Sequence, residues 1–345
     1  MSTNIREARI AFGFKKQSTI STASISADLW QMNKMNSQLA DVQFGTEINN
    51  DIGVGTDFVT EVFKTGKSMS IAMEKPATSQ FAAWAFGFGL GKTTKTGTGP
   101  WVYTSTPTVG SVDGIGLPAF TCIEALRAGT GGELFNRAMI GNVVNDFKFT
   151  VEKGPTRSAS RLSVNCVGTG NTIDTNVIAF PASTTVEHRM PSASAAVTIN
   201  GVNYITGGWL ESLELTYNNN IRTDDMYFPG SGVQNGFAIG GRMEFGDRRT
   251  CGLTFTARGA PTSPEITTLR NLTEGTAVIT LTGDLISGGD FHTTTITLHR
   301  NVFSALSFAD ANGIVTVNVT CQPMWHSTNG LITTATKTNI DAITT

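Results

Sequence analysis

Charge is scarce in this sequence of 345 residues, of which only 15 % are Asp, Glu, Lys or Arg. A soluble globular domain carries about 25 % charged residues. The formal net charge is −2, so no excess of one sign attracts the chain to nucleic acid or to an anionic membrane. Nor does the chain carry the excess charge that keeps a polypeptide disordered. The composition therefore indicates a folded chain.

Long hydrophobic runs are also missing. The longest, Phe81–Leu90, is interrupted by two glycines, whereas a membrane-spanning helix needs about 20 apolar residues. The segment Met1–Glu7 lacks the apolar centre of a secretion signal. We therefore expect a soluble protein that is made in the cytoplasm, with no insertion into a membrane.

Cysteines that lie close together in the sequence are absent too. The sequence has four cysteines, and no two of them form a Cys-x-x-Cys pair. Each lies within a stretch of alternating apolar residues: Cys122, Cys166, Cys251 and Cys321. Because free cysteine behaves as a small apolar side chain, we expect reduced thiols in the core rather than disulfides or metal ligands.

The sequence contains no complete catalytic motif. Gly91-Lys92-Thr93 matches the end of a phosphate-binding loop, but Phe86 stands where that motif needs its first glycine. No Gly-x-Ser-x-Gly motif occurs, and none of the four histidines has a partner at a metal-binding spacing. We therefore expect no enzymatic activity, no cofactor and no metal site, with the histidines at solvated positions on the surface.

Alternation with a period of two is what the sequence has instead. In Val143–Glu152, Thr293–His299 and Val315–Cys321, apolar residues alternate with threonine, asparagine or charged residues. This pattern is typical of β-strands that bury one face and expose the other. The chain also has 37 glycines, which suit the many turns of a sandwich or barrel. The sequence therefore predicts a mainly β protein.

Only two helices are expected. Ala77–Leu90 has Thr78 or Ser79 as a cap, bulky apolar residues at helical spacing, and glycines at its end. Pro264–Glu274 has a weaker apolar stripe and is followed by Gly275.

The order of these segments occurs twice. Each half has a strand that begins at a tryptophan, a long loop, a second strand, a helix and a closing hairpin. The tryptophans are Trp30 and Trp209, the loops Phe44–Phe58 and Asn220–Met243, and the second strands Ser68–Glu74 and Thr250–Ala257. We predict a tandem duplication, with domains at residues 1–175 and 176–345 and a C-terminal arm in the second. The alternative is a chance likeness of two β-rich halves.

This layout resembles the tail tube (major tail) proteins of tailed bacteriophages. The likeness covers most of residues 10–325 and is one of pattern rather than of an invariant signature. The segments that carry it are Phe12–Thr19 with Leu29-Trp30, Thr65–Ile71 running into Phe81–Trp84, Asn200–Val202, Leu213–Asn220, Gly240–Arg242 and the strand from Arg249.

The resemblance implies tandem tail-tube-like β-sandwich or half-barrel domains, each with one flanking α-helix. It implies a structural virion protein that self-assembles into stacked rings and so forms the tail tube, the conduit for DNA ejection. A ring would hold three two-domain chains with pseudo-sixfold symmetry, or six chains. The implied partners are further copies, the tape-measure protein, and the tail terminator and tail tip proteins, with DNA only in transit. The protein would be located in the tail of the virion, after synthesis in the cytoplasm of a bacterial host. The chain length favours a non-contractile tail.

Two sets of candidate contact residues follow from the resemblance. The long loops carry apolar residues, which a neighbouring ring would bury: Ile48, Ile52, Val54, Met226, Tyr227, Phe228, Phe237 and Ile239. The alternative is that these residues pack on their own domain.

The second set is a polar strand face, formed by Asp146, Ser163, Asn165, Thr316 and Asn318. Hydroxyl and amide side chains with some acids in a lumen would let DNA pass, because strong binding to DNA needs lysine and arginine at the phosphates. The sequence leaves open whether this face looks into the lumen or outward. The alternative function is a β-sandwich receptor-binding or decorating module on a virion surface.

Overall fold

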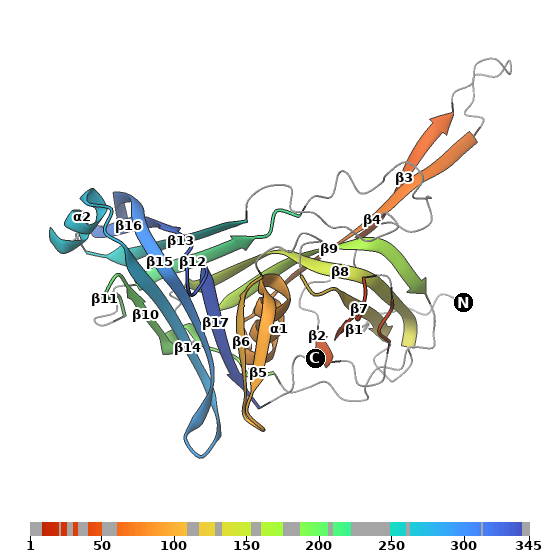
Figure 1. The fold of residues 1–345 in the computed structure, drawn as a ribbon, viewed down its shortest axis with the longest axis horizontal. Helices are drawn as coiled ribbons and strands as arrows, with labels where there is room; N and C mark the ends of the chain where they lie inside the picture. Colours follow the sequence, from red (N-terminus) through yellow and green to blue (C-terminus); the bar gives the residue numbers. More distant parts are fainter. Residues whose placement is uncertain are drawn as a thin grey trace.

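The computed structural model describes residues 9–20, 22–25, 30–33, 41–49, 61–108, 117–127, 133–152, 160–174, 187–205, 210–221, 249–259, 263–311 and 313–339. Strands dominate these residues, which include only two α-helices. The strands form one 17-stranded sheet that curls into a half-barrel (Figure 1). The predicted mainly β fold is thereby confirmed. Among the residues described, no helix has the length and hydrophobicity to span a membrane.

Seven strands form a first run, in which the hydrogen-bonded order is β2-β1-β7-β8-β9-β4-β3. All the pairings are antiparallel. The bounds are Arg9–Lys16 for β1, Trp30–Asn33 for β2, Asp41–Asn49 for β3, Glu61–Pro76 for β4, Phe120–Arg127 for β7, Glu133–Glu152 for β8 and Arg161–Asp174 for β9.

Seven later strands form a second run, in the order β11-β10-β14-β15-β16-β13-β12. These are β10 (Ala195–Ile199), β11 (Val202–Asn203), β12 (Leu210–Asn218), β13 (Thr250–Arg258), β14 (Gly275–Ser287), β15 (Asp290–Ala311) and β16 (Ile314–Pro323). If β1 and β2 are matched to β10 and β11, and β3 and β4 to β12 and β13, the two orders are the same.

Irregularities in the ladders also fall at matching places. The register of β8 against β9 shifts between Val144 and Asp146, and that of β15 against β16 shifts between Phe303 and Ala305. The register of β7 against β8 also shifts, just before Asn142 of β8. The register of β14 against β15 shifts in the same way, just before Asn301 of β15. Tandem duplication is one explanation of this agreement and stays a prediction.

The two runs share one sheet and one core. β12 of the second run pairs with Asp146–Glu152 of β8 in the first. The last strand, β17 (Ile332–Thr338), pairs with both β15 and β6 (Trp101–Pro107), and β6 also pairs with β5 (Gly91–Thr96). One cluster of buried apolar side chains draws on both runs. The predicted domain boundary after residue 175 stays a prediction.

The helix α1 (Ser79–Leu90) lies inside the curl, against β5, β6, β8, β15 and β17 (Figure 1). Thr78 caps it by accepting a hydrogen bond from the Phe81 amide at 3.2 Å, and Gly91 ends it at a φ of 97°. Every residue of α1 is buried, as expected for a helix that is apolar on all sides. The predicted helix and its cap are confirmed.

Two sequence predictions need correction. Part of the loop expected at Phe44–Phe58 is strand, because β3 continues to Asn49 and pairs with β4 in a long hairpin that projects from the sheet (Figure 1). The second helix, α2, spans Ser263–Arg270 and ends before Glu274, because Leu272 takes a positive φ of 47° in the following turn. All four cysteines are free and buried, as predicted.

The ring of Trp84 holds α1 in the core. Its centroid lies 4.5 Å from that of Phe14 and 5.2 Å from that of Phe120, so it connects the helix with β1 and β7. We expect Trp84→Ala to lower the free energy of unfolding by about 3–5 kcal/mol, because it leaves a cavity in the core. Urea unfolding followed by circular dichroism measures this loss. The control Trp325→Ala, at a side chain that is 48 % exposed, should change stability by no more than about 0.5 kcal/mol.

Candidate functional surface

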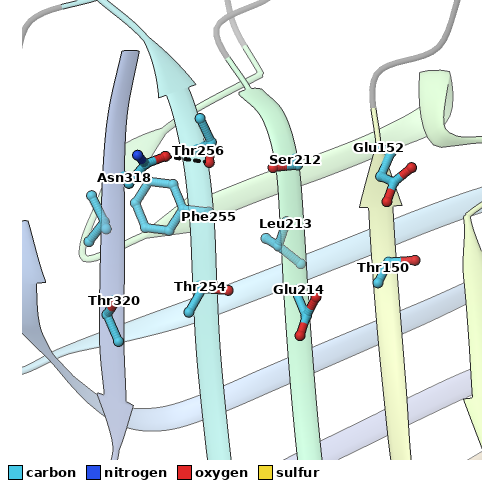
Figure 2. A pocket seen from close by; sticks show the side chains of 11 residues that line it. Thr150, Glu152, Ser212, Leu213, Glu214, Thr254, Phe255, Thr256, Asn318 and Thr320 are labelled. Carbon is cyan, nitrogen blue, oxygen red and sulfur yellow. Dashed lines mark hydrogen bonds between the residues drawn. The ribbon is translucent and has the colours of Figure 1, made fainter. Parts of the chain in front are cut away.

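A polar surface covers one side of β8, β12, β13 and β16 where these strands lie side by side (Figure 2). It contains a hollow of about 290 Å³. We call this surface the polar face, and the residues that line its hollow are Thr150, Glu152, Ser212, Leu213, Glu214, Thr254, Phe255, Thr256, Asn318, Val319 and Thr320. Because β8 belongs to the first run and the other three strands to the second, the polar face crosses the junction between the runs.

Alternation along the strands produces this surface. In β13, Cys251, Leu253 and Phe255 are buried, while Thr250 and Thr254 are exposed. The same holds in β8, where Phe147, Phe149 and Val151 face the core. The ring of Phe147 stacks on Tyr217 of β12, with 5.1 Å between centroids. The apolar sides of these strands thus hold the core together and leave the opposite side to hydroxyl, amide and carboxylate groups.

The structure places the predicted polar strand residues as follows. Asn165 on β9 donates a hydrogen bond to Asp146 on β8, with 2.6 Å between Nδ2 and Oδ1. Ser163 is half-buried on β9, directly opposite Lys148. Asn318 lines the hollow and accepts a hydrogen bond of 2.7 Å from the Thr256 hydroxyl (Figure 2).

Thr316 differs from the other four. It is only 3 % exposed, and its hydroxyl donates to the Ala309 carbonyl at 3.2 Å. The structure therefore brings Asp146 and Asn165 together, places Asn318 in the hollow, and keeps Thr316 out of reach of solvent.

Positive charges next to and on the polar face have carboxylate partners on neighbouring strands. Lys148 Nζ lies 2.7 Å from a Glu214 oxygen, and Arg161 Nη1 lies 2.8 Å from Glu74. Half-exposed pairs of this kind contribute only about 0–1 kcal/mol to stability. Their larger effect is to neutralise cations that phosphate groups would otherwise bind.

Arg258 pairs with Glu211 in the same way. Burial raises the pKa of the Asp146 carboxyl, although hydrogen bonds from Asn165 and Asn145 act in the opposite direction. Within the described parts of these strands, Lys148, Arg161 and Arg258 thus each have a carboxylate partner.

The predicted apolar contact residues fall almost entirely outside the described residues. Ile48 lies in β3, and its side chain is not described. The others lie outside the described ranges: Ile52, Val54, Met226, Tyr227, Phe228, Phe237 and Ile239. Their role stays a prediction.

A buried cluster surrounds His292, and the sequence patterns did not predict it. The His292 side chain is fully buried, and its Nδ1 lies 2.8 Å from the hydroxyl of Ser79, the first residue of α1. The ring of His188 stacks on it at 4.1 Å, and Nδ1 of His188 lies 3.3 Å from Asp284. The expectation that the histidines are solvated is therefore wrong for His292. The alternation of Thr293–His299, extended back by one residue, would have placed it inside.

The geometry of this cluster indicates a structural role. In other settings, a serine hydroxyl hydrogen-bonded to a histidine is a nucleophile with its general base. Here Ser79 and His292 are both fully buried, and among the described residues no group hydrogen-bonds Nε2 of His292. The hydrogen bond instead ties the start of α1 to β15. Among the residues described, no group of three or more His, Cys, Asp or Glu side chains is placed to hold a metal ion.

No protein-family model matches the sequence of the chain, and no curated protein matches it either.

The His292 cluster makes stability depend on pH. Burial and the neighbouring His188 lower the pKa of His292 to about 4, from 6.5. Because the unfolded chain binds this proton more readily than the folded one, stability is present above pH 6.5 and is lost as the pH falls towards 4. We expect a loss of about 1–2 kcal/mol between pH 7 and pH 5, measured by urea unfolding at each pH.

In His292→Gln this part of the pH dependence should disappear. His326→Gln, at a site remote from the cluster, serves as the control and should keep the pH dependence of the parent protein. Equal pH dependence in all three proteins would contradict the assignment to His292.

Proposed function

We propose that this chain is a structural virion protein that assembles with copies of itself into the stacked rings of a phage tail tube, the conduit for DNA ejection. The observation that carries the proposal is the repeated strand order within one sheet. Seven strands of the second run follow the pairing order of the first, and both runs have ladder shifts at the same places. A tandem duplication of one tube domain accounts for this agreement.

The join between the two runs also supports assembly. β12 adds to the edge of β8, so one run extends the sheet of the other. A contact of this head-to-tail kind generates a closed ring when its rotation closes and an open filament when it does not. With two runs in each chain, three chains give a ring of pseudo-sixfold symmetry.

The polar face suits the lining of such a ring. Its hollow is lined mainly by threonine, serine and asparagine, with two glutamates. The nearby lysine and arginine side chains are paired with carboxylates. Because these described cations are paired, phosphate groups would find few binding partners among them, so DNA could slide without strong salt-dependent binding. In this proposal the tape-measure protein and DNA occupy the lumen in turn, and terminator and tip proteins bind the ends of the tube.

Negative-stain electron microscopy of the purified chain tests the proposal. We expect rings or tubes with a central channel at high protein concentration, and the rotational symmetry of end-on views counts the chains in a ring. Compact particles that do not stack at any concentration or ionic strength would contradict the proposal and favour a receptor-binding or decorating module.

A lysine on the polar face tests its orientation within assembled tubes. Thr254 is exposed on this face, and in Thr254→Lys each chain of the tube contributes one cation. If the polar face lines the lumen, the variant should bind linear duplex DNA, which can thread, and not covalently closed circular DNA. The binding should weaken by at least about tenfold between 50 and 200 mM salt, because two phosphate contacts already give this change and each ring adds more.

Gel-shift experiments on assembled tubes measure both binding reactions. Thr328→Lys, in an exposed turn away from this face, is the matched control. Equal binding of linear and circular DNA by Thr254→Lys would place the polar face on the outside of the tube.

A further inference from the structure

Two strand edges stand without a recorded partner strand among the described residues. The second half of β15, Val302–Ala311, pairs with β16 along one edge only. β3 likewise pairs with β4 along one edge only. An unpaired edge of this length is a template for another strand and invites association.

The matched ladders show which strand occupies the corresponding edge in the first run. Since both ladders shift at the same point, Val144–Glu152 of β8 corresponds to Phe303–Ala311 of β15. In the first run this edge is covered by β12, with Asp146–Glu152 paired to Ser212–Asn218. Within the described ranges, no strand of the chain lies at the equivalent place in the second run.

The strand that corresponds to β12 is β3. Cys166 on β9 lies opposite Ile71, and Cys321 on β16 lies opposite Leu253. Two residues before these positions, Met69 pairs with Val42 and Cys251 pairs with Tyr217. Val42 of β3 therefore holds the place that Tyr217 holds in β12.

Exposed apolar side chains mark the uncovered edge. Phe149 of β8, which lies opposite Leu215 of β12, is 1 % exposed. Its counterpart in β15, Phe308, is 59 % exposed. Near it on β16, Ile314 and Val315 are also exposed. The exposed fractions of Phe149 and Phe308 differ as expected if β12 covers the edge of β8 within the chain and a second molecule covers the edge of β15.

We propose that β3 of one copy adds, antiparallel, to the free edge of β15 in the next copy, in the register of the β8–β12 pair. Tyr217 lies opposite Phe147, Asn218 opposite Asp146 and Thr216 opposite Lys148. The same register puts Val42 opposite Leu306, Gln43 opposite Ala305, and Asp41 opposite Ser307 of the neighbour. The closing of these contacts into a ring rests on the proposed function, whereas the pairing itself does not.

This contact between copies repeats the pairing of β12 with β8 that the chain makes within itself. Main-chain hydrogen bonds supply the affinity, as in other cases of strand addition. The register matters, because a slip by one residue would move every residue of the added strand to the opposite face of the sheet. The contact between chains repeats the contact between the two runs, so the same rotation relates neighbouring runs within a chain and between chains. Each chain therefore contributes two equal rotations to the ring.

Engineered disulfides test the register. Directly opposite residues of antiparallel strands have Cα atoms about 4.5–5.5 Å apart, which a disulfide can span. We expect Val42→Cys combined with Leu306→Cys to give covalent oligomers under mild oxidation, seen on a non-reducing gel. The matched control, Val42→Cys with Asp310→Cys, places the thiols about 13 Å apart along the strand and should stay monomeric on the gel. The native cysteines are all buried, so the parent protein should also stay monomeric.

A single charge at the edge gives a second test. Phe308→Asp should abolish association in sedimentation velocity and leave the circular dichroism melt unchanged, because the side chain is already exposed in the monomer. Phe291→Asp is the control, since Phe291 is also exposed (42 %) but lies at the turn between β14 and β15. It should associate like the parent protein.

The outcomes separate this inference from the proposed function. Rings in the microscope without the Val42–Leu306 disulfide would overturn the pairing and leave the tube proposal standing. The disulfide with no ring or tube at any concentration would support the pairing and overturn the tube. Equal cross-linking in the test pair and the control pair, or normal association of Phe308→Asp, would also overturn the pairing.

Discussion

The antiparallel pairing of β12 with β8 is the contact on which the rest of the structure depends. It makes two runs of strands into one sheet, and it places Phe147 on Tyr217 at the centre of a shared core. The polar face exists only because this pairing aligns threonine and glutamate side chains from both runs. Without it, α1 would lose part of the surface against which it is buried.

Much of the fold could be predicted from local patterns. The alternation in β8, β15 and β16, the cap at Thr78 and the stop at Gly91 are decided by residues close in sequence, and each was predicted from them. The hairpin of β3 was missed because its glycines, such as Gly45 opposite Gly66, are typical of loops. Here pairing with β4 outweighs the low strand propensity of glycine.

The functional surface was harder to predict, because it depends on distant partners. Asp146 and Asn165 hydrogen-bond to each other, yet nothing local shows that Asn318 lies in a hollow while Thr316, two residues away, is covered. His292 is similar: its inward direction follows from alternation, but its contacts with Ser79 and His188 join residues more than 100 positions apart. Such contacts come from the sheet order, which only the three-dimensional structure gives.

The four cysteines have a consequence for the life of a particle. Their thiols are buried in separate strands, and burial raises the pKa of Cys251 and of Cys321 to about 12. A thiol that stays protonated and shielded cannot attack a disulfide or take up an oxidant at a useful rate. Under the proposed function, a particle that leaves a reducing cell interior for aerated surroundings would keep these four thiols unchanged, and its durability would not rest on disulfides between them.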